Sequence, residues 1–216
     1  MDENYRALRI ESSFGRPTLK EDSKIELFLP SNGKLFYEQE RVGSIKEKEG
    51  ILTLTNYSGK IGLPKGMGFD IETTYQDIMG ILNSPANIGC TGGNVNLVLP
   101  KKSKLELCVS TIGNLSVDGK HEFNSGWKNQ GKKFEFFENM YEKAKSLTLS
   151  KPKLMKGENG EVCVDFFGAI DEYTEPIDIC LTYNLVNIHK TAGNVNIFYL
   201  ETDESPIKNW FERVTS

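Results

Sequence analysis

One pattern occurs twice in the middle of this chain, and the distance between its two copies restricts the fold more than any other feature. The copies lie 36 residues apart: Leu63-Pro64-Lys65 with Phe69-Asp70-Ile71, and Leu99-Pro100-Lys101 with Leu105-Glu106-Leu107. Internal similarity at such a period is typical of stacked repeats, in which each unit buries its apolar face against a neighbour. The pattern therefore predicts a repetitive architecture.

Residues 51–118 contain short runs in which apolar and polar residues alternate, and glycines separate the runs. Alternation with period two indicates β-strands, and glycine tolerates the sharp bends between them. The 36-residue step then contains two coils of about 18 residues each. One such coil loses more backbone entropy than its few inward side chains return, so the coils must stack. Gly193-Asn194-Val195-Asn196 repeats Gly93-Asn94-Val95-Asn96, which indicates that the same coil type continues late in the chain.

These patterns predict one all-β domain over residues 1–216, a β-solenoid of short strands. Residues 1–118 are expected to form the first coils, 119–160 an irregular insert, 161–204 further coils and 205–216 a C-terminal cap. The cap is predicted to be a short helix, because Ser205-Pro206 resembles an N-cap followed by proline in the first turn. Within the insert, residues 134–147 fit either a helix or a strand.

The composition argues against two classes of partner. The formal net charge is −4, whereas a nucleic-acid-binding domain normally carries a basic surface, so no nucleic acid is expected. The chain contains no apolar run of about 18 residues, so no membrane span is expected. Its first residues lack the basic and apolar regions of a signal peptide. We therefore expect either a cytoplasmic protein or one whose targeting or anchoring segment is missing from this sequence.

The chain has four cysteines, Cys90, Cys108, Cys163 and Cys180, and their spacing does not match a CxxC motif. Cys108 and Cys180 stand at the same place in matching alternations, 72 residues apart, which is twice the repeat step. We expect ordinary reduced cysteines at strand positions, while a disulfide and a metal pair stay as alternatives.

The Leu-Pro-Lys, Phe-Asp-Ile-Glu-Thr and Gly-x-Val-x-Leu cadence resembles a bacterial adhesin-like family of uncharacterised proteins. The resemblance covers about residues 51–119 and, less closely, 162–201. It implies a right-handed, single-stranded β-helix and a location in the cell envelope or at the cell surface. The matching motifs describe a coil, so the resemblance assigns no catalytic or binding residue.

Candidate chemistry is sparse in the sequence. Residues 89–93 form a glycine cluster, but a strand pattern follows it where a phosphate loop needs a helix, so a turn is favoured. His121 and His189 lack partners at metal-ligand spacing, and no metal or cofactor is predicted. Five acidic residues are candidates for a carboxylate pair that cleaves polysaccharide, although outward polar positions are the simpler interpretation: Asp165, Asp171, Glu172, Glu175 and Asp178.

The insert is the best candidate for a binding region, because long departures from a repeat usually form loops on one face. Trp127 with Lys128, Lys132 and Lys133 is suited to stack on a sugar or to contact an anionic partner, and Trp127 alone is equally suited to pack over the domain. The sequence thus favours a non-enzymatic structural or interaction module that presents one face to a protein or glycan. The alternatives are a polysaccharide-acting enzyme and a regulatory or envelope-stress protein with the repeat as scaffold.

Overall fold

The computed structural model describes residues 5–13, 23–100, 103–109, 115–117, 120–121, 152–166, 184–190 and 193–200. This part of the chain is built from β-strands and one 3-10 helix (η1, Gln39–Arg41), without an α-helix. The strands are β1 (Ala7–Ser12), β2 (Lys24–Phe28), β3 (Phe36–Tyr37), β4 (Ser44–Lys48), β5 (Ile51–Thr55), β6 (Gly59–Gly62), β7 (Gly68–Thr73), β8 (Asp77–Ile81), β9 (Ala86–Cys90), β10 (Val95–Pro100), β11 (Lys104–Val109), β12 (Leu115–Val117), β13 (Lys120–His121), β14 (Lys153–Lys156), β15 (Val162–Asp165), β16 (Leu185–Lys190) and β17 (Val195–Leu200).

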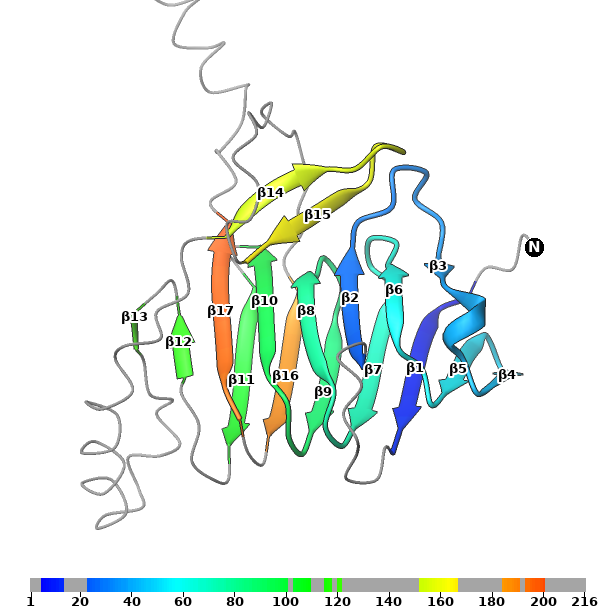
Figure 1. The fold of residues 1–216 in the computed structure, drawn as a ribbon, viewed down its shortest axis with the longest axis horizontal. Coiled ribbons are helices and arrows are strands. Elements are labelled where there is room, and N and C mark those ends of the chain that lie inside the picture. The colour runs from blue at the N-terminus through cyan, green and yellow to red at the C-terminus, as the bar shows by residue number, and fades with distance from the viewer. Residues whose placement is uncertain are drawn as a thin grey trace, which may run out of the picture.

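The strands form two large sheets, between which the chain alternates, and one small sheet (Figure 1). Sheet A has seven strands in the order β11-β16-β9-β7-β1-β5-β4. Sheet B has eight strands in the order β13-β12-β17-β10-β8-β2-β6-β3. Pairing within each large sheet is parallel except at the edges, where β4, β3 and β13 pair antiparallel. The third sheet is the antiparallel hairpin β14-β15.

The main core lies between sheets A and B and follows from the alternation in each strand. In β1, for example, Leu8 and Ile10 are fully buried, while Arg9 and Glu11 are exposed. Register pairing extends this pattern, because Ile10 lies level with Leu54 on one side and Ile71 on the other. In sheet B, Ile78 is in register with Ile25 and Val95, and all three are fully buried. The core is thus a set of rows of aliphatic side chains that run across the strands, which maximises apolar burial.

The hairpin β14-β15 covers part of the outer face of sheet B (Figure 1). Phe166 at the end of β15 packs with Ile81 of β8, Val98 of β10 and Phe198 of β17 in a second buried cluster. The rings of Phe166 and Phe198 are 6.2 Å apart and tilted by 47°. A backbone bridge between Leu29 and Val162 joins the hairpin to the end of β2. The hairpin therefore explains why Ile81 of β8 and Val98 of β10 are buried although they point away from the main core.

The strand register shows that residues matched by the 36-residue repeat lie at the same level of a sheet. Phe69 is in register with Ala86, Ala86 with Val186, and Val186 with Leu105. Phe69 and Leu105, the matched residues of the two copies, therefore stand at the same level of sheet A. Two strands separate them, and one of these, β16, comes from the far end of the chain.

The prediction of a β-solenoid, a single-stranded right-handed β-helix with coils stacked in chain order, is wrong. The strands form separate sheets with both parallel and antiparallel pairs, and their order is not sequential. β1 lies between β5 and β7, and β16 lies between β9 and β11. The physical reason is that parallel ladders use backbone groups common to all residues, so a strand from a distant part of the chain pairs as well as a neighbour. The sequence pattern reports which residues share a level, but not which strands are adjacent.

Side-chain amides connect residues 187–196 of the chain to residues 87–96 on the neighbouring strands. Asn187 donates to Asn87 at 2.9 Å, Asn194 to Asn94 at 3.0 Å and Asn196 to Asn96 at 2.8 Å, and each pair is 100 residues apart. The repeated Gly-Asn-Val-Asn motif thus pairs with itself across β10 and β17.

Parts of the expected organisation lie outside the described residues. These are the C-terminal helix over 205–216 and residues 134–147 of the insert. At the end of the insert, the backbone N–H of Gly160 donates to the carbonyl oxygen of Gly157 at 3.0 Å, and this turn joins β14 to β15. The insert is therefore not irregular throughout, since β14 belongs to it.

Candidate binding site

A polar recess of about 450 Å³ lies where several strands of sheet A end. Because parallel strands in register end at the same edge, β1, β5 and β7 place their last residues side by side there. Every lining residue carries a hydroxyl, carboxamide or carboxylate group: Glu11, Ser12, Ser13, Thr55, Asn56, Glu72, Thr73, Thr74 and Thr91. We call these nine residues the polar recess.

Two carboxylates mark this recess. Glu11 of β1 and Glu72 of β7 are register partners on the outer face of sheet A. Adjacent strands lie about 4.8 Å apart, so both side chains leave the sheet from neighbouring points. Two residues earlier on the same strands, Arg9 Nε and Asp70 Oδ2 form an ion pair at 2.9 Å. Within the described residues, no ion pair neutralises Glu11 or Glu72. The recess therefore has a negative wall.

A buried hydrogen-bond network fixes the floor of the polar recess. Thr73 Oγ1 donates to Gln76 Oε1 at 3.0 Å, and Gln76 Nε2 donates to the carbonyl oxygen of Tyr57 at 2.7 Å. The backbone N–H of Tyr57 donates to Ser12 Oγ at 3.0 Å. Gln76 is fully buried, so its amide is costly to leave unpaired and these bonds hold the strand ends in place. The floor of the recess, at Ser12 and Thr73, is consequently preorganised.

Tyr57 anchors the same end of sheet A. Its hydroxyl donates to the carbonyl oxygen of Lys60 at 2.7 Å and accepts from the backbone N–H of Glu38 at 3.1 Å. Burial is the main cause that raises the pKa of the Tyr57 phenol far above its ordinary value, so this group stays neutral at physiological pH. Beside it, the backbone N–H of Asn56 donates to the carbonyl oxygen of Glu11 at 2.8 Å. One wall residue of the recess is thus tied directly to another.

The described residues offer hydrogen-bond chemistry rather than an assembled metal site. They contain no group of three or more His, Cys, Asp or Glu residues placed to hold a metal ion. Serine and threonine hydroxyls both donate and accept, the Asn56 amide does the same, and ionised carboxylates accept only. Such a set matches a ligand with many hydroxyl groups, because each hydroxyl is itself a donor and an acceptor.

The binding residues expected from the sequence, Trp127, Lys128, Lys132 and Lys133, lie outside the described residues. So do four of the five acidic candidates, Asp171, Glu172, Glu175 and Asp178. Asp165 lies at the end of β15, in the small sheet that covers part of sheet B, whereas the polar recess belongs to sheet A. The structure therefore does not join Asp165 to Glu11 or Glu72.

Other sequence candidates have structural positions. Residues 89–93 end β9 and turn into β10, with Gly93 at φ +75°, so the expected turn is confirmed. His189 is exposed on β16, whereas the side chain of His121 and all of Cys180 lie outside the description. Cys90 and Cys163 are free thiols, as expected for reduced cysteines.

Sequence reasoning missed the polar recess because its residues come from four separate strand ends, with Ser13 and Thr91 about 80 residues apart in the chain. No local motif joins them. The one available signal is that β1, β5 and β7 each end in hydroxyl or carboxylate residues, at Glu11-Ser12, Thr55 and Glu72-Thr73. Recognising it requires the strand order.

Two further observations bear on what the chain is. No helix within the described ranges is long and apolar enough to cross a membrane. Comparison of the chain with protein-family models, with curated proteins and with solved structures gave no match, so no relative supports or opposes the adhesin-like resemblance.

Proposed function

We propose that this protein is a binding module whose polar recess takes a glycan or another polyhydroxylated ligand. One observation carries the proposal: all nine described residues that line the recess are polar, and a buried network holds two of them, Ser12 and Thr73, in place at its floor. A ligand that gains affinity mainly from hydrogen bonds needs such fixed partners, since flexible side chains would lose entropy on binding.

The composition of the recess favours a glycan over a protein partner. Protein interfaces usually centre on aromatic or aliphatic anchors that are buried on binding. The described lining of the recess includes none, and the exposed large apolar residues of the described part are Phe36, Ile45 and Leu185 on other elements. The polar surface also continues past the recess, through the Arg9–Asp70 pair. An oligosaccharide longer than the recess would therefore find further hydrogen-bond partners.

Glu11 and Glu72 are the expected specificity residues. An ionised carboxylate that accepts hydrogen bonds from two sugar hydroxyls contributes roughly twice as much per bond as a neutral acceptor. The two side chains stand next to each other, which suits neighbouring hydroxyl groups on one sugar ring. Loss of one charge-assisted bond costs roughly 1.5–3 kcal/mol, or about 10- to 100-fold in affinity.

The adjacent carboxylates also give a second candidate function, hydrolysis of a glycosidic bond. Retaining glycosidases place two carboxyl groups about 5–5.5 Å apart, and neighbouring strands allow that separation. In such enzymes, however, the two groups flank the scissile bond from opposite sides. Glu11 and Glu72 leave the same sheet face in parallel, which suits binding better than cleavage.

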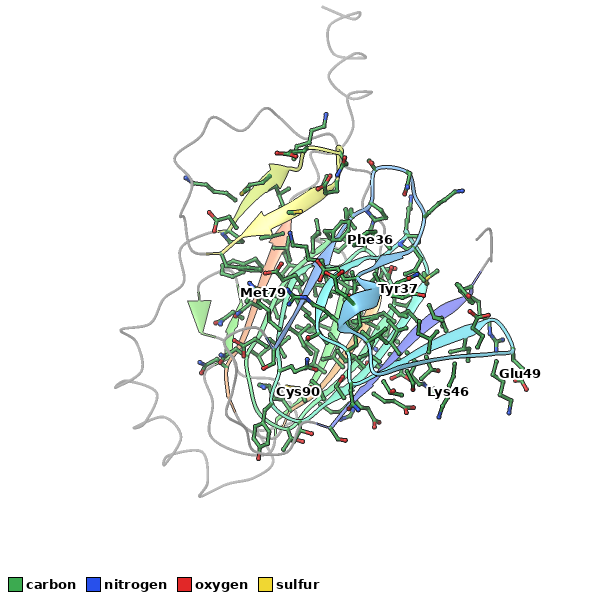
Figure 2. All side chains as sticks on the ribbon, turned by 45° about the vertical axis from the view of Figure 1, so that its right-hand side comes forward. Phe36, Tyr37, Lys46, Glu49, Met79 and Cys90 are labelled. Atoms are coloured by element: carbon green, nitrogen blue, oxygen red, sulfur yellow. The ribbon has the colours of Figure 1, made fainter. Side chains whose placement is uncertain are left out.

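A binding screen with point variants tests both functions. The protein is screened against a panel of neutral oligosaccharides, and the best ligand is measured by titration calorimetry with Glu11→Gln, Glu72→Gln and the control Glu49→Gln. Glu49 is 72% exposed in its side chain and lies at the far edge of the molecule, by β4 (Figure 2). We expect the affinity for the ligand to fall 10- to 100-fold in Glu11→Gln and Glu72→Gln and to stay unchanged in the control. Absence of any ligand, or equal affinity in all variants, would contradict binding at the recess, and ligand breakdown that requires both glutamates would establish the hydrolase instead.

A further inference from the structure

Cys90 and Lys190 form a buried thiol–amine pair that the polar recess does not use. They are register partners at the ends of β9 and β16. Lys190 Nζ lies 3.4 Å from Cys90 Sγ, and each residue is only 3% exposed. Figure 2 shows Cys90 near the lower end of the sheets, away from Phe36 at the upper edge.

Backbone carbonyls hold the amine against the sulfur. Lys190 Nζ donates to the carbonyl oxygens of Gly93 at 2.7 Å and Gly92 at 3.3 Å, and the Cys90 thiol donates to the Gly92 carbonyl. Gly93 is in the left-handed region at φ +75°, and a Cβ there would overlap the backbone of Gln76. The turn that supplies the carbonyls is therefore restricted in conformation as well as in sequence.

The buried Lys190 amine is compensated by two backbone carbonyls and no carboxylate among the described residues. Lysine is almost never fully buried unless it is paired with an opposite charge, because desolvation of the ammonium group is costly. Among the described residues, no carboxylate forms an ion pair with Lys190. The same contacts hold the amine 3.4 Å from the Cys90 sulfur, where the two groups are placed to react.

We propose that Cys90 and Lys190 are an oxidative cross-linking site, where peroxide joins Sγ and Nζ through one bridging oxygen atom. One peroxide molecule oxidises the thiol to a sulfenic acid and leaves one water. A second peroxide accepts two electrons as the sulfenic oxygen bonds to Nζ of the Lys190 ammonium group; the O–H bond of the sulfenic acid and two N–H bonds break, and two waters and one proton are released. The product gains one oxygen atom and loses two hydrogen atoms relative to the thiol and the neutral amine. The bridging oxygen suits a pair that is in contact but not close enough for a direct bond without further movement.

The reaction is slow compared with that of an exposed thiol. Burial raises the pKa of the Cys90 thiol, and the nearby Lys190 opposes this only in part, so little thiolate is present at neutral pH. Cys163 in the hairpin is only half-buried and therefore serves as the internal comparison.

The cross-link would join two segments that are 100 residues apart in the chain. It would fix β16, which is inserted between β9 and β11, to its neighbour β9. Closing so long a loop restricts the unfolded state strongly, and we expect Tm to rise by about 10 °C. The pair would thus act as a covalent lock that forms under oxidising conditions and opens under reducing ones.

Peptide mapping of the whole folded chain tests this proposal. The protein is treated with hydrogen peroxide, digested without reductant and analysed by mass spectrometry. We expect one species that links the Cys90 and Lys190 peptides with one added oxygen and two lost hydrogens, and dithiothreitol should remove it. Oxidation in denaturant should not produce it, because the two residues are then no longer in contact.

Variants add a second readout. Cys90→Ser and Lys190→Arg should lose both the linked species and the oxidation-dependent rise in Tm, while Cys163→Ser should keep both. If Cys163 becomes oxidised but Cys90 gives only unlinked acids, or if the linked species lacks the oxygen atom, the oxygen bridge is refuted. The measurement on the unmodified protein decides the question even if a variant does not fold.

Discussion

Replacement of Gly80 by alanine should damage this fold far more than replacement of Gly33, although both glycines have positive φ. Gly80 lies within β8 at φ +133°, and an added Cβ would overlap the carbonyl oxygen of Leu27. Leu27 belongs to β2, which is held between β8 and β6, so its backbone cannot move without breaking a parallel ladder. Gly33 is in a turn at φ +65°, and a Cβ there would meet no atom within 4 Å.

The magnitudes follow from these two environments. Placing an alanine in the left-handed region costs roughly 1–2 kcal/mol, which is the whole expected effect at Gly33. At Gly80 the displaced backbone adds to the conformational strain, for a total of about 4 kcal/mol. For a chain of this size the expected decreases in Tm are about 10 °C for Gly80→Ala and about 4 °C for Gly33→Ala.

Thermal unfolding monitored by circular dichroism, together with urea unfolding of both variants, measures the difference. A similar loss at the two positions would show that β2 does not lie against Gly80. The placement of β2 beside β8 in sheet B would then be incorrect.

Two further perturbations probe the supports of the recess and of the hairpin. Tyr57→Phe should lower the free energy of unfolding by about 1–2 kcal/mol, because it leaves the carbonyl oxygen of Lys60 and the amide of Glu38 unpaired. Since the pKa of Tyr57 is raised in the folded state, the stability that this phenol contributes is complete below about pH 10 and is lost as pH rises above that value. In a urea-unfolding series across pH, the free energy of unfolding should therefore fall more steeply at alkaline pH in the unmodified protein than in Tyr57→Phe. Parallel curves would refute this. Phe166→Ala should lower the free energy of unfolding by about 3 kcal/mol, because it removes a buried ring from the hairpin cluster. An unchanged urea-unfolding curve would show that the hairpin does not pack on sheet B.

The sequence predicted where strands form and which residues lie at the same level of a sheet, but not which strands are adjacent. Alternation located β5, β7 and β11, and the 36-residue repeat matched Phe69 with Leu105, which the register places at one level. The order of strands depends on long-range pairing through backbone groups, and these carry no sequence label. The identity of the motifs at Gly93 and Gly193 was a usable signal, since their asparagines are direct partners.

The candidate site was harder to predict than the strands. Glu11 and Glu72 are 61 residues apart in the chain, and each is an ordinary outward residue of an alternating strand. Only the insertion of β1 between β5 and β7 brings them together. The Lys190–Cys90 contact has the same origin, because β16 comes from the late segment. Prediction of either site needs the strand order first.

An engineered disulfide between positions 11 and 72 tests the central claim most directly. In the structure these residues are register partners on adjacent strands, about 4.8 Å apart, which is within the Cα range for a disulfide. Stacking in chain order would instead place β5 between β1 and β7, about 10 Å apart, which is too far.

The protein with Glu11→Cys and Glu72→Cys is oxidised and its linked peptides are identified by mass spectrometry, with Glu11→Cys and Asp70→Cys as a control shifted by two residues along β7. We expect a disulfide between positions 11 and 72 in nearly all molecules, and little between 11 and 70. Absence of the first link, or equal yield of both, would contradict the strand order on which the polar recess depends.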